Sequence, residues 1–413
     1  MDKPWLKFYD SGIPAEINFP PITLPDLLDQ AVERNSRGIA ISFFGRKTTY
    51  AKLQHQVNQI AIALTRLGVK KGDRVALMLP NIPQYPVLHF AVLKIGAILV
   101  PTNPLYVERE LQYQLNNSGA RTVVTLDVHY PKIQRVKAET GIENIIVTSV
   151  KDYLPPVLRI LYPLRARKDG KRNKIRRAPG VHFFEDLLAE DFVMELPDVT
   201  VTPADIALLM YTGGTTGLSK GAILTHGNLV ANVMQIRTWY GDVKENEEKV
   251  LSALPFFHSY GLTTCLHMAV LLRSTMVLIP DPRDLKTLLR TVEKEKTTLF
   301  SGVPTLFIAI NNFPEISKRY DVSSIKACVS GGAPLPLEVA KEFEANTGGA
   351  LVEGYGLSEA SPVTHVNSIS GKRKEGSIGM PLPNTDAKIV DPQTKKELPV
   401  GEIGELAVRG PQV

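Results

Sequence analysis

Short apolar strands alternate with amphipathic helices along most of this 413-residue chain. The pattern begins with a strand at residues 74–79, a helix at 85–95 and a strand at 97–100, and it returns between residues 250 and 353. Parallel strands need long crossover connections, which helices usually supply, and strands that are apolar throughout are typical of sheets covered on both faces. The sequence therefore predicts an α/β fold with mostly parallel sheets covered by helices.

The chain is too long for one ordinary hydrophobic core, so we expect subdomains. A first α/β subdomain is predicted at residues 1–200, with a basic insertion at 151–178. A second, at 201–370, repeats the pattern and gives the layered arrangement αβαβα. Beyond it, short strand-like pieces separated by Gly and Pro predict the start of a small β-barrel subdomain at 371–413.

A loop rich in glycine and hydroxyl side chains follows the predicted strand at 205–211. Residues 211–221 read Tyr-Thr-Gly-Gly-Thr-Thr-Gly-Leu-Ser-Lys-Gly. Its backbone N–H groups, hydroxyls and lysine can converge on phosphate oxygens. A Walker A loop is excluded, because it needs Gly-Lys-Ser/Thr and runs directly into a helix. Here a second strand is predicted first, at 222–224, and only then do Thr225 and Asn228 begin a helix.

Eight residues of this loop are candidate phosphate ligands. The alternative is a hairpin turn without a ligand, which we favour less because a turn needs only one or two special residues. The candidates are Thr212, Gly213, Gly214, Thr215, Thr216, Gly217, Ser219 and Lys220.

Two further motifs also follow predicted strands, where open α/β sheets bind ligands. The first, at 255–261, contains His258, which can donate a hydrogen bond to a carboxylate or an α-phosphate; the alternative is a histidine packed in the core. The second contains Gly332, Ala333 and Pro334, whose small size lets a flat ring approach the backbone. The same residues also suit a tight turn that begins a helix.

The segment Glu353-Gly354-Tyr355-Gly356-Leu357-Ser358-Glu359 combines a ring, a hydroxyl and two carboxylates. Tyr355 can stack on adenine and Ser358 can bind phosphate. Glu359 is a hard oxygen ligand suited to Mg²⁺, which prefers one or two carboxylates plus substrate phosphates. Taken alone, a Tyr-Gly turn near a Glu is more often structural.

Together these motifs resemble those of the adenylate-forming, or AMP-binding, enzyme superfamily, and the chain is most similar to its long-chain fatty acid–CoA ligase branch. The resemblance implies ATP, Mg²⁺ and coenzyme A, with fatty acid as the acyl substrate. It implies that the loop holds the β- and γ-phosphates, that His258 lies beside the acyl and α-phosphate site, and that Lys220 and Glu359 act with it in catalysis. Glu359 and Thr216 are the implied magnesium ligands.

The remaining implied nucleotide contacts come from the other two motifs. They are Gly332, Ala333, Pro334, Glu353, Gly354, Tyr355, Gly356 and Ser358. Some long-chain members have a tryptophan at the position of Leu262 that gates the fatty-acid tunnel. Because leucine stands there in this chain, an aromatic gate is not expected.

The resemblance covers the large N-terminal portion of such an enzyme. In relatives, a ribose-binding aspartate and the catalytic lysine of a mobile C-terminal domain lie beyond the point where this sequence ends, at Val413. We therefore expect a truncated chain that is weakly active or inactive in adenylation. Dimers are common in this branch, which makes a homodimer an alternative to a monomer.

Charge is concentrated in the insertion. Residues 151–177 carry ten basic and two acidic side chains, a net charge of +8 against +6 for the whole chain. This is not the diffuse basic footprint of a nucleic-acid-binding protein. The apolar stretch at 153–164 followed by a basic tail suits an anionic membrane surface, at roughly 1 kcal/mol per basic residue near the lipid. A solvated insertion loop is an equal alternative.

The location we expect is cytoplasmic, with peripheral contact to the inner face of the membrane as an extension. The N-terminus lacks the apolar segment of an export signal, and no apolar run reaches the length of a bilayer crossing. Cys265 and Cys328 lie in apolar surroundings and are expected to be core thiols. The alternative functions are an adenylating ligase for another carboxylic acid or a carrier protein, and a non-catalytic nucleotide- or lipid-binding module.

Overall fold

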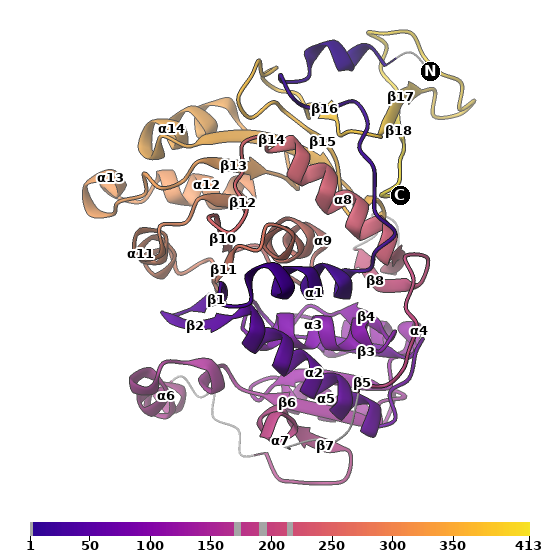
Figure 1. Cartoon of the computed structure of the whole chain (residues 1–413), viewed down its shortest axis with the longest axis vertical. Helices are drawn as coiled ribbons and strands as arrows, with labels where there is room; N and C mark the ends of the chain where they lie inside the picture. Colours follow the sequence, from indigo (N-terminus) through magenta and orange to yellow (C-terminus); the bar gives the residue numbers. More distant parts are fainter. Residues whose placement is uncertain (1–2, 169–174, 190–195, 213–217) are drawn as a thin grey trace.

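The structure is a computed structural model that describes residues 3–168, 175–189, 196–212 and 218–413. Two large sheets lie one above the other, and helices α1, α3 and α9 lie between them (Figure 1). Further helices cover the outer faces of the sheets. The predicted layered α/β architecture is confirmed.

The first sheet has seven strands in the order β7-β6-β5-β3-β4-β8-β9. It is parallel except for β9, which runs antiparallel to β8 at the edge. Every residue of β5 is buried, as expected for a strand with both faces covered. The strands are β3 (Arg74–Met78), β4 (Ile98–Pro101), β5 (Thr122–Leu126), β6 (Asn144–Thr148), β7 (Val181–Phe183), β8 (Ile206–Thr212) and β9 (Lys220–Thr225).

Helices alternate with these strands along the chain. They are α2 (Tyr50–Arg66), α3 (Gln84–Lys94), α4 (Glu108–Ser118), α5 (Tyr130–Lys137), α6 (Pro156–Lys168) and α7 (Phe184–Ala189), preceded by α1 (Leu24–Asn35). Three short 3₁₀ helices are η1 (Pro4–Phe8), η2 (Val150–Tyr153) and η4 (Ser358–Ala360).

The second sheet has nine strands in the order β16-β15-β14-β13-β12-β10-β11-β1-β2. Its centre, from β1 to β14, is parallel, and antiparallel strands close both edges. The strands are β1 (Ile39–Phe43), β2 (Arg46–Thr49), β10 (Lys249–Ser252), β11 (Thr275–Leu278), β12 (Leu299–Gly302), β13 (Ala327–Ser330), β14 (Ala350–Gly356), β15 (Val363–Val366) and β16 (Met380–Pro381).

The helices of this half begin with α8 (His226–Trp239), whose N-cap is Thr225 as predicted: its hydroxyl accepts from the backbone N–H of Asn228. The others are α9 (Ser259–Gly261), the π-helical turn η3 (Leu262–His267), α10 (Met268–Leu271), α11 (Leu285–Glu295), α12 (Pro304–Asn311), α13 (Ile316–Arg319) and α14 (Leu337–Thr347).

The division between the sheets does not fall at residue 200. The N-terminal strands β1 and β2 belong to the second sheet, where β1 pairs with β11. Conversely, β8 and β9 belong to the first sheet, where β8 pairs with β4. The predicted boundary assumed that neighbours in sequence share a sheet, whereas these strands cross between the halves. The subdomain limits themselves stay a prediction.

At the C-terminal end, a small antiparallel sheet forms in the region predicted to begin a β-barrel subdomain. Strands β17 (Asp386–Val390) and β18 (Glu405–Arg409) form a two-stranded antiparallel sheet, and Val390 forms an isolated bridge with Glu397. The barrel subdomain itself stays a prediction. Residues 377–379 form no strand.

Buried residues and helix lengths bear on two further expectations. Cys265 and Cys328 are both buried and free, as predicted. Within the described ranges, every helix is too short or too polar to cross a bilayer.

Candidate functional site: a cavity at the carboxyl ends of four strands

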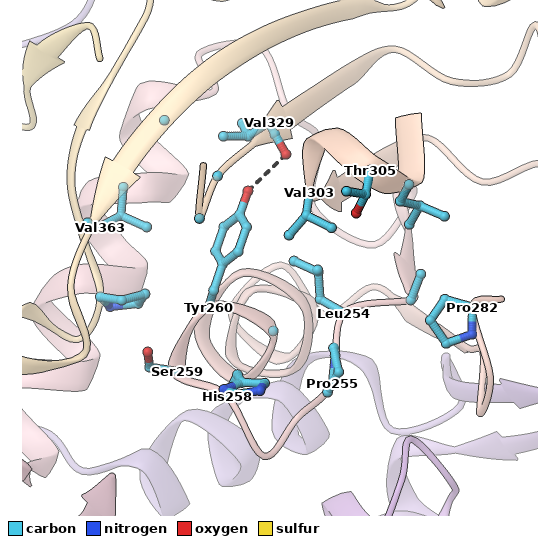
Figure 2. A pocket seen from close by; sticks show the side chains of 18 of the residues that line it. Leu254, Pro255, His258, Ser259, Tyr260, Pro282, Val303, Thr305, Val329 and Val363 are labelled. Atoms are coloured by element: carbon cyan, nitrogen blue, oxygen red, sulfur yellow. Dashed lines mark hydrogen bonds between the residues drawn. The ribbon is translucent and has the colours of Figure 1, made fainter. Parts of the chain in front are cut away.

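A cavity of about 710 Å³ opens where β10, β12, β13 and β14 end. Residues just beyond the ends of these strands line it, among them Ala253, Val303 and Gly331. Parallel strands present their carboxyl ends at one edge of a sheet, which is where open α/β sheets bind ligands. The cavity also takes in part of the 255–261 motif, as Figure 2 shows.

The structure brings residues of three predicted motifs together around this cavity. Those that line it are His258, Gly332, Gly354, Tyr355, Gly356 and Ser358. These positions lie up to about a hundred residues apart along the sequence, and only the strand order makes them neighbours.

Tyr260 braces the cavity wall. Its hydroxyl donates to the backbone oxygen of Val329 at 2.8 Å, a bond that Figure 2 shows crossing from α9 to the end of β13. Burial raises the pKa of Tyr260 far above its usual value, so the phenol keeps its proton and remains a donor. A Cβ at Gly331 would lie 3.0 Å from the Tyr260 ring, which explains the glycine there.

His258 caps the N-terminal end of α9 at the exposed rim of the cavity. Its ring lies beside the Phe257 ring, with centroids 4.9 Å apart. The surrounding walls remove part of its hydration, and this desolvation lowers the pKa of His258 below its usual value. A neutral imidazole at physiological pH can donate one hydrogen bond and accept another.

The predicted adenine turn begins at Gly332, whose backbone φ of +81° favours glycine. Ala333 and Pro334 follow it and are exposed, outside the cavity lining. The carboxylate of Glu353 accepts the backbone N–H of Leu335 at 3.1 Å. Glu353 therefore holds the turn, and its contact with nucleotide stays a prediction.

Tyr355 presents its ring to the cavity with 37% of its surface exposed, and the ring meets His365 edge to face. Next to it, a Cβ on Gly356 would overlap the carbonyl oxygen of Pro362. The Ser358 hydroxyl lies 3.1 Å from that of Ser259, which links η4 to α9. An exposed aromatic face beside close-packed backbone suits the stacking of a flat ring.

The predicted phosphate loop joins β8 to β9, and η4 packs against both strands. Thr212 and Lys220 are paired across the hairpin. The Ser219 hydroxyl donates to the Thr212 carbonyl at 2.6 Å, so this hydroxyl is used in closing the hairpin. Lys220 is exposed. The remaining loop candidates, Gly213, Gly214, Thr215, Thr216 and Gly217, lie outside the described residues.

Glu359, in η4, is exposed and lies on the side of the cavity nearest the hairpin. Among the described residues it has no hydrogen bond or ion pair, and no group of three or more His, Cys, Asp or Glu side chains is arranged to hold a metal. A single free carboxylate fits Mg²⁺ that takes its other ligands from substrate phosphates and water. The other predicted ligand, Thr216, lies outside the described residues.

The comparisons with known proteins agree with this geometry. A family model described as "AMP-binding enzyme" matches residues 28–413. The long-chain-fatty-acid–CoA ligase of Bacillus subtilis is 46% identical over 412 residues, covering 100% of this chain and 73% of that protein. The chain belongs to the AMP-binding enzyme family.

Two further relatives extend the comparison. The long-chain-fatty-acid–CoA ligase of Escherichia coli O6:H1 is 38% identical over 416 residues, which cover all of this chain and 74% of that protein. The crystal structure of a long-chain-fatty-acid–CoA ligase from Archaeoglobus fulgidus superposes with a TM-score of 0.82 at 26% identity, over 98% of this chain and 78% of that one.

The lining of the cavity bears on where a fatty-acid tunnel would run. Leu262 is fully buried at the start of η3 and does not line the cavity. Residues 301–308 contribute Val303, Thr305 and Leu306 to the lining, whereas 233–240 contribute no lining residue.

Sequence reasoning missed the side chains that brace this cavity. Asn81 and Tyr85 contact the segment before His258 from the other half of the molecule, and Ser259 and Tyr260 tie α9 to η4 and β13. Asn81 could have been proposed from the sequence, because it follows the strand predicted at 74–79 and ligands bind at the carboxyl ends of such strands.

Proposed function

We propose that the chain is the ATP- and acyl-binding part of a long-chain fatty acid–CoA ligase. The observation that carries this proposal is the convergence of His258, Tyr355 and Ser358 on one cavity beside the β8–β9 hairpin. The names of the relatives that match the whole chain support the same substrate class.

The lining of the cavity supports an acyl substrate. Most of its walls are apolar. Polar side chains of α9 and η4 line one part of it, and Arg283 and Thr305 line another. The apolar lining includes Leu254, Pro255, Val303, Leu306, Ala309, Val329 and Val363. An apolar cavity with a few converging polar groups is the usual form of a small-molecule site.

In the proposed reaction, a carboxylate oxygen of the fatty acid attacks the α-phosphorus of ATP, and pyrophosphate leaves. Lys220 neutralises charge on the triphosphate, and neutral His258 donates a hydrogen bond to the carboxylate or the α-phosphate. Glu359 would hold Mg²⁺, which supplies further charge neutralisation when bound. The thiol of coenzyme A then attacks the acyl carbon, and AMP leaves.

The test has two parts. A non-hydrolysable acyl-AMP mimic should bind this chain far more tightly than ATP or fatty acid alone, because an adenylating enzyme is complementary to the adenylate. Carboxylate-dependent pyrophosphate exchange across chain lengths, measured on the full-length enzyme, should favour long chains. A preference for acetate or aromatic acids would show a different ligase, and equal affinity for mimic and ATP would favour a non-catalytic module.

We also propose that the protein is cytoplasmic and contacts the inner face of the membrane. Helix α6 lies at one edge of the molecule in Figure 1. Its exposed side chains include Val157, Ile160 and Leu161, with exposed fractions of 68%, 76% and 51%. The turn η2, just before this helix, is fixed, because the Arg46 guanidinium donates to the backbone oxygen of Asp152 at 3.0 Å.

Charge supports this surface as a lipid contact. The surrounding 151–177 segment carries a net charge of +8, and exposed apolar residues with basic neighbours bind anionic bilayers. Flotation with acidic liposomes should recover the chain, whereas neutral liposomes should not. A homodimer also stays a prediction, which analytical ultracentrifugation would test.

A further inference from the structure

The segment between β10 and His258 is held from the opposite half of the molecule. The side-chain amide of Asn81 donates to the backbone oxygens of Ser252 at 2.8 Å and Leu254 at 2.7 Å. The oxygen of the same amide accepts the backbone N–H of Phe256 at 2.9 Å. One side chain therefore fixes three backbone groups within five consecutive residues.

Asn81 is well suited to this task because it is only 3% exposed and follows β3 of the seven-stranded sheet. Tyr85 adds a fourth bond, since its hydroxyl donates to the backbone oxygen of Phe256 at 3.0 Å, and the two rings pack edge to face. Hydrogen bonds in such a dry place are costly to break, because the freed backbone groups find no water.

The other side of the same segment is also closed. A Cβ at Gly261 would lie 2.7 Å from the Leu254 oxygen and would also overlap that of Pro255, so α9 lies directly on the segment. Leu254 and Pro255 line the cavity, and His258 follows two residues after Phe256. Any shift of the segment therefore moves both the cavity wall and the His258 ring.

We propose that Asn81, with Tyr85, is a positioning residue for the adenylation site: it sets the place of the 252–256 segment and hence of His258. This inference rests on the proposed function, since it concerns the same cavity. Asn81 does not itself line that cavity, so its effect on ligands is transmitted through the backbone it holds.

The chain offers a matched control at Gln84. This amide is also fully buried, at the start of α3, and donates to the Thr148 hydroxyl at 3.0 Å and to the Ser149 oxygen at 2.9 Å. Its partners lie at the end of β6, outside the cavity. Asn81→Leu and Gln84→Leu thus each remove one buried side-chain amide from the region around the start of α3. The first variant loses hydrogen bonds to the 252–256 segment, and the second loses hydrogen bonds to the end of β6.

Hydrogen exchange read by mass spectrometry tests the proposal without any ligand. Asn81→Leu should speed exchange of the amides at 252–261, whereas Gln84→Leu should speed it near 148–153 and leave 252–261 as in the unchanged chain. Unaltered exchange at 252–261 in Asn81→Leu, or an equal change in both variants, would overturn the proposal. If Asn81→Leu does not fold, Tyr85→Phe gives the same comparison with one bond removed.

Binding of the acyl-AMP mimic supplies the second readout. Asn81→Leu should weaken it by tenfold or more, since a displacement near 1 Å in a site costs up to about 100-fold. Gln84→Leu should stay within about twofold of the unchanged chain at similar loss of thermal stability. Failure of the unchanged chain to bind the mimic would count against the proposed function alone, because the exchange experiment still decides the role of Asn81.

Discussion

The cavity wall and helix α6 both follow a strand of a parallel sheet and both carry apolar side chains, but they are built in opposite ways. Leu254 of the wall is 6% exposed, whereas Ile160 of α6 is 76% exposed. The wall at 252–261 is concave and is braced from β3, β13 and η4. Helix α6 protrudes and is fixed near its base by Arg46, with an Arg159–Glu185 ion pair along its length. Apolar side chains that line a braced hollow suit a small ligand, whereas exposed apolar side chains on a protruding helix suit an extended surface.

The largest effect is expected at Gly356. Gly356→Ala places a methyl group against the Pro362 carbonyl, so the end of β14 and the backbone just before β15 must move apart. Binding of the acyl-AMP mimic should fall by about 100-fold, with a stability loss of about 1–3 kcal/mol. Gly141→Ala is the control, because a Cβ there meets nothing within 4 Å. Calorimetry and thermal unfolding measure both effects, and unchanged affinity would remove Gly356 from the site.

Glu359 should affect ligand binding without affecting the fold. Its carboxylate is exposed, so Glu359→Gln should leave thermal stability unchanged. If Glu359 holds Mg²⁺, the gain in ATP affinity that added magnesium gives should shrink by at least about tenfold. Glu338, another exposed glutamate, near the start of α14, supplies the control Glu338→Gln. An equal magnesium response in both variants would contradict the ligand assignment.

Helix α6 should contribute to lipid affinity and not to ligand binding. Ile160→Asp removes a largely exposed apolar side chain, and burying isoleucine in an apolar phase is worth about 1.5–3 kcal/mol, so liposome affinity should fall at least about tenfold. Mimic binding should not change. Ile403→Asp is the control, because Ile403 is also exposed, at 99%, far along the chain. Equal flotation of both variants would end the membrane proposal.

A pH effect on stability, separate from ligand binding, is expected from two buried histidines. His89 of α3 and His267 of η3 are buried, with their Nε2 atoms 3.1 Å apart. Burial lowers the pKa of His267 to about 3 and lowers that of His89 well below its usual value, with smaller contributions from nearby His226. Protonation of either ring would place a charge in a dry interior.

The direction of the pH effect follows from these shifts. An unfolded histidine has a pKa near 6.5, so in acid the unfolded chain binds more protons than the folded one. Stability is complete above about pH 6.5 and should fall as the pH is lowered toward 3, by at most about 1.4 kcal/mol per pH unit for each histidine. The double variant His89→Leu/His267→Leu should flatten this dependence in urea unfolding at pH 7, 6 and 5. His55→Gln, at an exposed site, should not.

Particular elements show how far the sequence alone could go. The helix predicted at 85–95 and the strand predicted at 97–100 correspond to α3 and β4 with each bound within one residue, and Thr225 was identified as an N-cap. These predictions succeed because hydrophobic period and capping are local properties. His258 and Tyr355 could be proposed from the sequence because each lies at or beyond the end of a predicted strand, and both line the cavity. The sequence did not show that the side chains of Glu353 and Ser219 also bond to backbone groups, because those contacts depend on the folded turn and hairpin.

What the sequence determined by itself was the succession of strands and helices, the kinds of side chain at the strand ends and the family that they resemble. Only the tertiary structure decided which sheet β1, β2, β8 and β9 join, and therefore which distant residues meet. The physical reason is that helix and strand formation depend on neighbours a few residues away. The contact of Asn81 with Leu254 depends instead on how two complete sheets pack against each other.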